Sequence, residues 1–181
     1  DDTERFLAFQ VAALDWMSQW EHLPDVLHCH DHHTALIPFM TKYCPIFQRL
    51  SNIKTVFTIH NGLYQGWFSW SKSNLLPFYD PWKSGLLDWN NTINPMSSAI
   101  RCAGAVTTVS WSYMYELMES ANGLESLFRE VAYKCHGVLN GIDIEVWNPE
   151  TDTYLEHHYT EHTVNEVKNI HKQEICQLFQ F

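Results

Sequence analysis

The chain has 181 residues, a formal net charge of −10 with 11 lysines and arginines, and 45% hydrophobic residues. This length suits one domain of ordinary size that buries a core without disulfides or metal. The negative charge repels phosphate backbones and argues against a nucleic-acid partner. No apolar run approaches the roughly 20 residues of a membrane crossing, which argues against a membrane protein.

Cysteine usage and the first residues bear on the cellular compartment. Five cysteines are scattered along the chain without a CxxC pair, which favours free thiols in a reducing, cytoplasmic setting. The opening DDTERFLAFQ has neither the basic start nor the apolar middle of a signal peptide. We therefore expect either a cytoplasmic protein or a chain whose true beginning is missing.

Helical and strand-like patterns alternate in chain order. Apolar residues from Phe6 to Met17 recur at helical spacing, and a strand-like run follows. The predicted order is helix 6–17, strand 25–30, helix 34–43, strand 54–60, helix 94–103, strand 105–110, helices 112–119 and 124–132, strand 135–140 and a final helix over 164–179. This alternation predicts an α/β fold with a parallel sheet and no internal domain boundary.

Polar side chains follow the predicted strands. The first strand ends in His30-Asp31-His32-His33, the second in His60-Asn61-Gly62, and the fourth in Asn140-Gly141. An α/β sheet of this kind binds its ligand at the carboxyl ends of the strands. We therefore expect imidazole, carboxylate and amide groups to gather along one rim of the sheet.

The hexapeptide HCHDHH at residues 28–33 raises the question of a metal site. His28 and His30 lie on the same face of a strand, an arrangement that can supply two zinc ligands. Asp31 directly follows His30, however, and does not precede the last histidine as in HxHxDH hydrolases. A barrel-type site would also need a longer chain. We expect no metal and read His28 as a buried, hydrogen-bonded strand residue, with a zinc-dependent hydrolase using His28, His30 and Asp31 as the alternative.

Other reaction classes find little support in the sequence. The chain has no GxGxxG or GxxxxGK[ST] phosphate loop and no GxSxG nucleophile turn, and Ser110 is expected to cap the next helix. A glycosidase needs two nearby carboxylates, whereas only Asp31, with Asp143 as a distant second, follows a strand. Aromatic residues such as Tyr64 and Trp67 suit stacking on sugar rings. A hydroxyl-rich ligand is expected, and a noncatalytic sugar-binding module stays open as a third interpretation.

Four segments resemble motifs of one known family. DVLHCHDHHTALIP at 25–38 resembles "DVVHAHDWHTALVP" of bacterial and plant glycogen/starch synthases, and TVFTIHNGLYQG at 55–66 is similar to "TVFTIHNLAYQG". VTTVS at 106–110 resembles the start of "VTTVSPTY". VLNGID at 138–143 followed by WNPETD at 147–152 resembles "ILNGIDxxxWNPxTD". The motifs follow in the family's order and span nearly the whole chain.

The resemblance implies the GT-B fold, in which two Rossmann-like domains face each other across a cleft. It also implies retaining transfer of glucose from a nucleotide-sugar donor, ADP-glucose for preference, to the nonreducing end of an α-1,4-glucan acceptor, without a cofactor. Residues 1–181 would then be part of the N-terminal, acceptor-side domain. The glycine-rich phosphate loop would precede Asp1, and the nucleotide-binding C-terminal domain would be absent. The fragment alone is expected to be inactive.

The resemblance also assigns site residues by position. His60 and Asp31 correspond to the family's catalytic histidine and aspartate. Asn61 and Asn140 match amides that hydrogen-bond the glucose, since an amide both donates to and accepts from hydroxyls. Tyr64, Gln65 and His32 complete the expected substrate-binding set.

Three positions depart from the family pattern. His32 replaces the Trp of "HDWH", which puts one sugar-stacking contact in doubt. Trp111-Ser112 replaces the Pro-Thr of "SPTY", and Gly104 replaces the Asp of "YAD". These last two are expected to affect only loops and helix starts.

Overall fold

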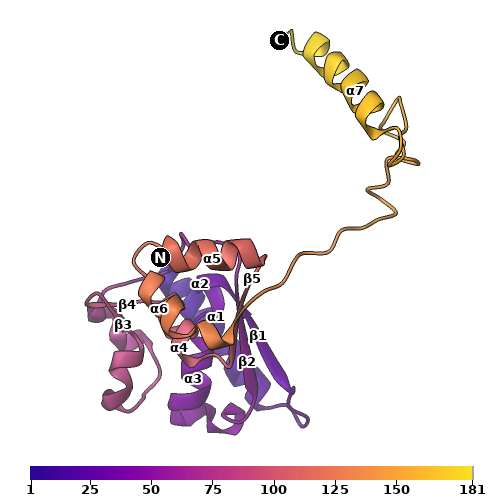
Figure 1. Ribbon diagram of the computed structural model, residues 1–181. Coiled ribbons are helices and arrows are strands. Elements are labelled where there is room, and N and C mark those ends of the chain that lie inside the picture. The colour runs from indigo at the N-terminus through magenta and orange to yellow at the C-terminus, as the bar shows by residue number, and fades with distance from the viewer. Residues whose placement is uncertain (181) are drawn as a thin grey trace. The chain divides into compact units, whose positions relative to one another are not determined.

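The computed structural model describes residues 1–180 (Figure 1). It divides into two compact units, Asp1–Leu139 and the residues from Asn140 onward. The sequence indicated no internal boundary, whereas the structure separates these two units. The physical reason is burial: every core residue precedes Asn140, and no side chain in 140–180 is buried. The apolar residues of the second unit are too widely spaced among polar ones to form a core of their own.

The first unit is built on the predicted parallel sheet. Its strands are β1 (Val26–His30), β2 (Lys54–Ile59), β5 (Ala105–Thr108) and β6 (Cys135–Gly137), paired in the order β1-β2-β5-β6. All three pairings are parallel, with His30 opposite Thr58 and Thr58 opposite Thr107. The α/β class and the Rossmann-like parallel sheet are thereby confirmed.

The chain also contains helices, short turns and a second, small sheet. The helices are α1 (Asp2–Ser18), α2 (Asp31–Thr34), α3 (Ile37–Tyr43), α4 (Pro95–Cys102), α5 (Trp111–Glu119), α6 (Glu125–Glu130) and, in the second unit, α7 (Val164–Leu178). Short 3-10 turns are η1 (Pro45–Leu50), η2 (Trp70–Leu75), η3 (Pro81–Leu86) and η4 (Ala132–Lys134), and a small antiparallel pair is β3 (Asp88–Trp89) with β4 (Thr92–Ile93). None of the described helices is both long and apolar enough to cross a membrane.

One face of the sheet forms the core. Residues alternate along β1, so that Leu27 and Cys29 are buried while His28 and His30 are exposed. Phe57 of β2 and Val106 of β5 continue the buried face and join side chains from α1, α3, α4, α5 and α6 in one cluster. The opposite face carries largely polar, partly exposed residues. Within the first unit, His28 and His30 are exposed on this face, although parallel sheets are normally covered on both faces.

Several expected boundaries differ from the structure. The predicted helix 34–43 is two helices, because Pro38 stands in the first turn of α3 and fits a helix start better than a helix interior. The fourth strand ends at Gly137 and not at residue 140. Gly137 lies against the start of α5, where a Cβ would come within 2.1 Å of the Trp111 nitrogen. The expected cap is present: the Ser110 hydroxyl accepts a hydrogen bond from the Tyr113 N–H at 2.9 Å.

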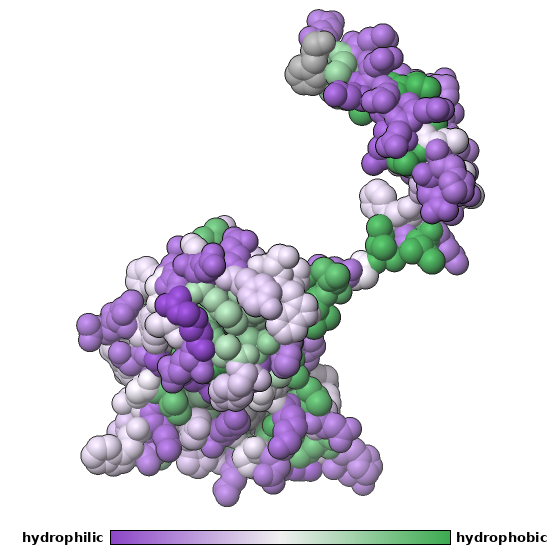
Figure 2. Space-filling view, in the orientation of Figure 1, coloured by the Kyte–Doolittle hydropathy of each residue, from purple (hydrophilic) through white to green (hydrophobic). Residues whose placement is uncertain are grey.

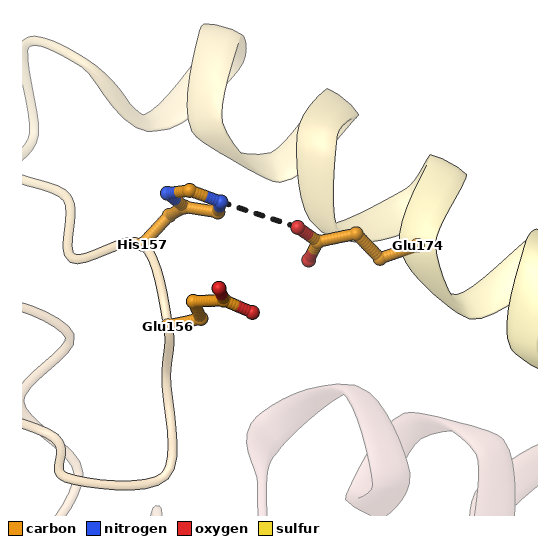
Figure 3. A group of neighbouring side chains, drawn as sticks. All are labelled: Glu156, His157 and Glu174. Atoms are coloured by element: carbon orange, nitrogen blue, oxygen red, sulfur yellow. Dashed lines mark ion pairs between the residues drawn. The ribbon is translucent and has the colours of Figure 1, made fainter.

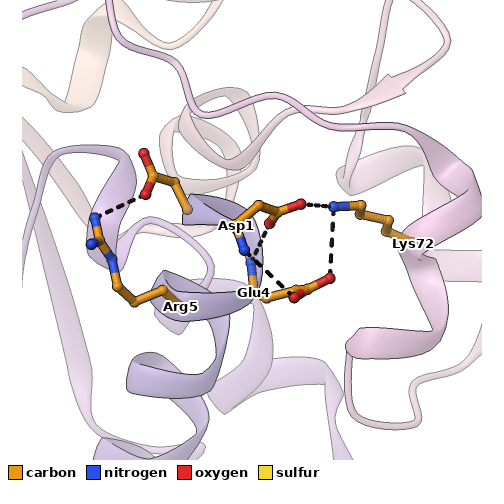
Figure 4. A network of polar contacts seen from close by, with 5 residues as sticks. Asp1, Glu4, Arg5 and Lys72 are labelled. Carbon is orange, nitrogen blue, oxygen red and sulfur yellow. Dashed lines mark hydrogen bonds and ion pairs between the residues drawn. The ribbon is translucent and has the colours of Figure 1, made fainter.

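A small ion-pair network lies at the start of α1 (Figure 4). The Asp1 carboxylate caps the helix by accepting from the Glu4 N–H at 3.0 Å. Lys72, in η2, makes ion pairs with Asp1 and with Glu4, the latter at 3.8 Å. Exposed ion pairs of this kind contribute about 0–1 kcal/mol, so the network orients the helix start more than it stabilises the fold.

Candidate active site

Asp31 stands where β1 ends and α2 begins. Its Oδ1 accepts a hydrogen bond from the His60 N–H at 2.8 Å and a longer one from the Asn61 N–H at 3.4 Å. The Asp31 backbone has a φ of 52°, a left-handed conformation that Asp tolerates better than most residues. Asp31 therefore fixes the loop that follows β2, and the expected meeting of Asp31 and His60 at one rim is observed.

Three imidazoles form a column beside this carboxylate. The rings of His28 and His30 are 4.1 Å apart, and those of His30 and His60 are stacked at 5.3 Å. The His30 Nδ1 lies 3.1 Å from the His60 Nε2, within hydrogen-bond distance. Burial, followed by the neighbouring His28 and His60, lowers the pKa of His30, while Asp31 acts in the opposite direction.

The base of the column is tied into the sheet. The His28 Nε2 lies 2.6 Å from the Thr58 hydroxyl, which in turn lies 2.5 Å from the Thr107 hydroxyl. His28 is thus hydrogen-bonded as expected, but the expectation that it is buried is wrong, because its face of the sheet is uncovered. The chain of contacts from Thr107 to His60 crosses three strands.

Asn61 and Tyr64 lie in the loop after β2. The Asn61 Oδ1 accepts from the Leu63 N–H at 3.0 Å, which shapes the turn, and the Tyr64 side chain is exposed. The Gly62 N–H donates to the Tyr113 hydroxyl at 2.9 Å, so α5 holds the loop from the other side. His60 and this loop line a cavity of about 410 Å³ together with α5. The two residues are placed where a ligand can reach them.

His32 lies against Phe6 of α1 and against Gly66. It packs edge to face with Phe6 at 5.7 Å and against Gly66, where a Cβ would come within 2.8 Å of the His32 side chain. His32, Gly66 and Trp67 line a separate cavity of about 220 Å³. Burial and the neighbouring His33 lower the pKa of His32. A sugar-stacking role like that of the family tryptophan stays a prediction.

Gln65 makes its side-chain hydrogen bonds within the protein. Its side chain is buried, and its amide donates to the backbone carbonyls of Ala121 at 3.1 Å and Asn122 at 3.2 Å. Its Oε1 accepts from the Asn94 side chain at 2.7 Å. Both amide donors are therefore used within the protein, so Gln65 anchors the loop, and a substrate-binding role for Gln65 stays a prediction.

Asn140 is the first residue of the second unit and lies three residues beyond the end of β6. Its expected meeting with the other rim residues stays a prediction. The neighbouring Asp143 accepts two hydrogen bonds from the backbone N–H groups of Glu145 and Val146, both at 3.0 Å, in a local turn.

The HCHDHH hexapeptide does not converge on one point. Cys29 faces the core, and burial raises the pKa of its thiol to about 12, which disfavours the thiolate that zinc binds. Within residues 1–180, the three-residue group with ligand atoms close enough to share an ion is Glu156, His157 and Glu174 of the second unit (Figure 3). All three are exposed, and His157 pairs with Glu174 at 3.2 Å. The geometry thus gives the zinc hydrolase alternative no support at residues 28–33.

Sequence reasoning missed the contributions of His30 and Tyr113. His30 was expected at the rim and as a possible metal ligand but not as the partner of His60, and its HxH spacing with His28 was the available signal for a shared strand face. Tyr113 gave no signal, because its hydroxyl reaches the loop from a helix 51 residues further along the chain. Contacts of that separation depend on how the helix docks.

The parallel sheet, with Asp31 bound to the His60 backbone where two of its strands end, defines a Rossmann-like domain. The family model described as "Starch synthase catalytic domain" matches residues 1–130. The chain belongs to this family, and the resemblance drawn from its motifs is confirmed.

Individual relatives agree with that assignment. A glycogen synthase of Flavobacterium johnsoniae is 49% identical over 180 residues, covering 99% of this chain and 38% of the relative. One from Streptococcus agalactiae is 44% identical, covering 93% and 37%. Among solved structures, the catalytic domain of starch synthase IV from Arabidopsis thaliana, bound to ADP and acarbose, matches with a TM-score of 0.72 and 31% identity, covering 96% of this chain and 37% of that one. The chain spans less than two fifths of the length of these relatives.

Proposed function

We propose that the parent protein is a glycogen/starch synthase-type glucosyltransferase, and that residues 1–181 are part of its N-terminal, acceptor-side domain in a GT-B arrangement. It would transfer glucose from a nucleotide-sugar, ADP-glucose for preference, to the nonreducing end of an α-1,4-glucan with retention. The observation that carries the proposal is the Asp31 contact with the His60 N–H, which joins the two family motifs at one rim. The ADP in the Arabidopsis complex supports the choice of donor.

In this proposal the rim residues bind and orient the glucosyl unit. Imidazole and amide groups suit sugar hydroxyls, because each offers hydrogen-bond donors and acceptors. Asp31 uses Oδ1 on the backbone of His60 and Asn61, so part of its effect is to position His60. By fixing the backbone of His60, the Asp31 contact favours glucose transfer, because a fixed side chain holds the sugar in the geometry that the reaction needs.

Two features support the proposal that this is a piece of a larger enzyme. The sheet face carrying His28 and His30 is uncovered, although parallel sheets are normally covered on both faces. Leu139, Ile142 and Ile144 are 79%, 69% and 75% exposed, and hydrophobic atoms are visible on the segment after the first unit (Figure 2). The sheet face and the exposed apolar residues are both suited to contact with other parts of the parent protein. We expect the fragment alone to be inactive. A cytoplasmic location is supported by the five free cysteines.

The test is transfer by the parent protein. We expect purified parent to move labelled glucose from ADP-glucose onto glycogen, and the new linkages to be α-1,4 by NMR, as retention requires. The 181-residue chain should show no transfer under the same conditions. Glycogen co-sedimentation by the parent without any transfer would instead support a noncatalytic sugar-binding module.

A further inference from the structure

The closest polar contact of the His60 ring is with another imidazole. The His30 Nδ1 and His60 Nε2 are 3.1 Å apart, and the rings are stacked with an interplanar angle of 29°. Two nitrogens at this distance need one proton between them, since two lone pairs repel and two N–H groups clash. The protonation pattern of one ring therefore determines that of the other.

The surroundings of His30 disfavour its protonated form. Burial and the adjacent His28 and His60 rings lower its pKa, and only Asp31 opposes them. His28 is itself held by Thr58 at 2.6 Å, and its ring lies 4.1 Å from that of His30. His30 is thus an oriented imidazole whose protonation is disfavoured, and its Nδ1 is the partner of the His60 Nε2.

We propose that His30 is a positioning residue that holds His60 in a single tautomer, with the His60 Nε2 engaged by His30 and the Nδ1 left to the ligand. The expected effect of His30 on glucose transfer rests on the proposed function. The expected effect of His30 on the tautomer of His60 does not. Asp31 holds the backbone of His60, and His30 holds its ring. A group fixed by two partners is better placed to discriminate a transition state from a ground state.

Two substitutions separate the hydrogen bond from packing. His30→Leu keeps a side chain of similar reach but removes the nitrogen that is the partner of the His60 Nε2. His30→Asn keeps a polar atom near the position of Nδ1, and the amide can either donate or accept. His22→Leu, in the exposed loop before β1, is the matched control for the loss of an imidazole.

The first readout is NMR of the 181-residue chain with isotope-labelled histidine, and it needs no enzyme activity. We expect the two His60 ring nitrogens of the wild type to show one protonated and one unprotonated signal, and His30→Leu to show averaged signals. His30→Asn and His22→Leu should retain the wild-type pattern. A His60 pattern that does not change in His30→Leu would overturn the proposal.

The second readout is transfer by the parent. We expect His30→Leu to lower kcat about tenfold with a small change in KM, His30→Asn to recover most of the loss, and His22→Leu to match the wild type. Equal losses in the Leu and Asn variants would contradict a hydrogen-bonding role. If the parent transfers no glucose at all while NMR shows the tautomer change, the proposed function fails and the assignment of His30 stands.

Discussion

The Asp31 carboxylate accepts a hydrogen bond from the His60 backbone N–H at 2.8 Å. This contact joins the end of β1 to the end of β2, 29 residues apart in the sequence. It explains why an aspartate with a left-handed backbone stands at this point: the φ of 52° turns the chain into α2 while the side chain reaches the next strand. Strained positions of this kind concentrate at functional sites.

The role of Asp31 can be divided by two substitutions. Asp31→Asn keeps an acceptor for the His60 N–H and tolerates positive φ, so we expect a loss of less than about 1 kcal/mol in the free energy of unfolding. Asp31→Ala removes the acceptor and should cost about 1.5–3 kcal/mol. Urea denaturation of the 181-residue chain measures both. Equal stability of the two variants would show that the contact does not hold the loop.

The buried amide of Gln65 gives a prediction about stability. Gln65→Leu leaves the Asn94 side chain and two backbone carbonyls without their partner, and we expect a cost of about 2–3 kcal/mol. A double-mutant cycle with Asn94→Ala should show a coupling of at least 0.5 kcal/mol. Additive effects in urea denaturation would mean that the two side chains act independently.

Gly137 is expected to be intolerant of any side chain. A Cβ there would lie 2.1 Å from the Trp111 nitrogen, which belongs to the backbone and cannot move alone. Gly137→Ala should therefore separate β6 from α5 and lower the thermal midpoint by several degrees or prevent folding. Gly85→Ala, where nothing lies within 4 Å, is the matched control and should change the midpoint little.

Acidification should destabilise the first unit through His30 and His32. The pKa of each is lowered by folding, so the unfolded chain binds protons first as the pH falls below the ordinary value of 6.5. Stability should be full above pH 6.5 and decrease below it, with Asp31 opposing both shifts and Asp2 also opposing that of His32. Urea denaturation between pH 7.5 and 5 tests the sign. The slope should be smaller in His30→Asn, and an unchanged slope would exclude His30 as a cause.

Much of the first unit was predictable because apolar and β-branched runs mark strands that are buried on at least one face. The polar residues at the ends of β1 and β2 were likewise predictable, since parallel strands align their carboxyl ends. The positions where strands end were harder to predict. The pairing of β5 with β6 stops at Thr108 opposite Gly137, although the sequence stays strand-like beyond both residues. Only the docking of neighbouring elements determines where a ladder stops.

The fate of individual polar side chains was harder to predict. Gln65 and Asn61 carry the same functional group four residues apart, yet one is buried in a network and the other is exposed at the rim. That difference comes from the fold of the loop against Ala121 and Asn122, which no local pattern encodes. The boundary at Asn140 was missed for a related reason, because amphipathic spacing in α7 does not reveal whether its apolar face finds a partner.

We propose that His60 acts at the reacting sugar. The most direct measurement compares the parent protein with its His60→Ala variant in transfer of labelled glucose from ADP-glucose to glycogen, with glycogen co-sedimentation and thermal unfolding as controls. We expect the variant to fold and to bind glycogen but to transfer at least a hundredfold more slowly, about 2.7 kcal/mol in the barrier. Near-normal transfer by His60→Ala would contradict the account.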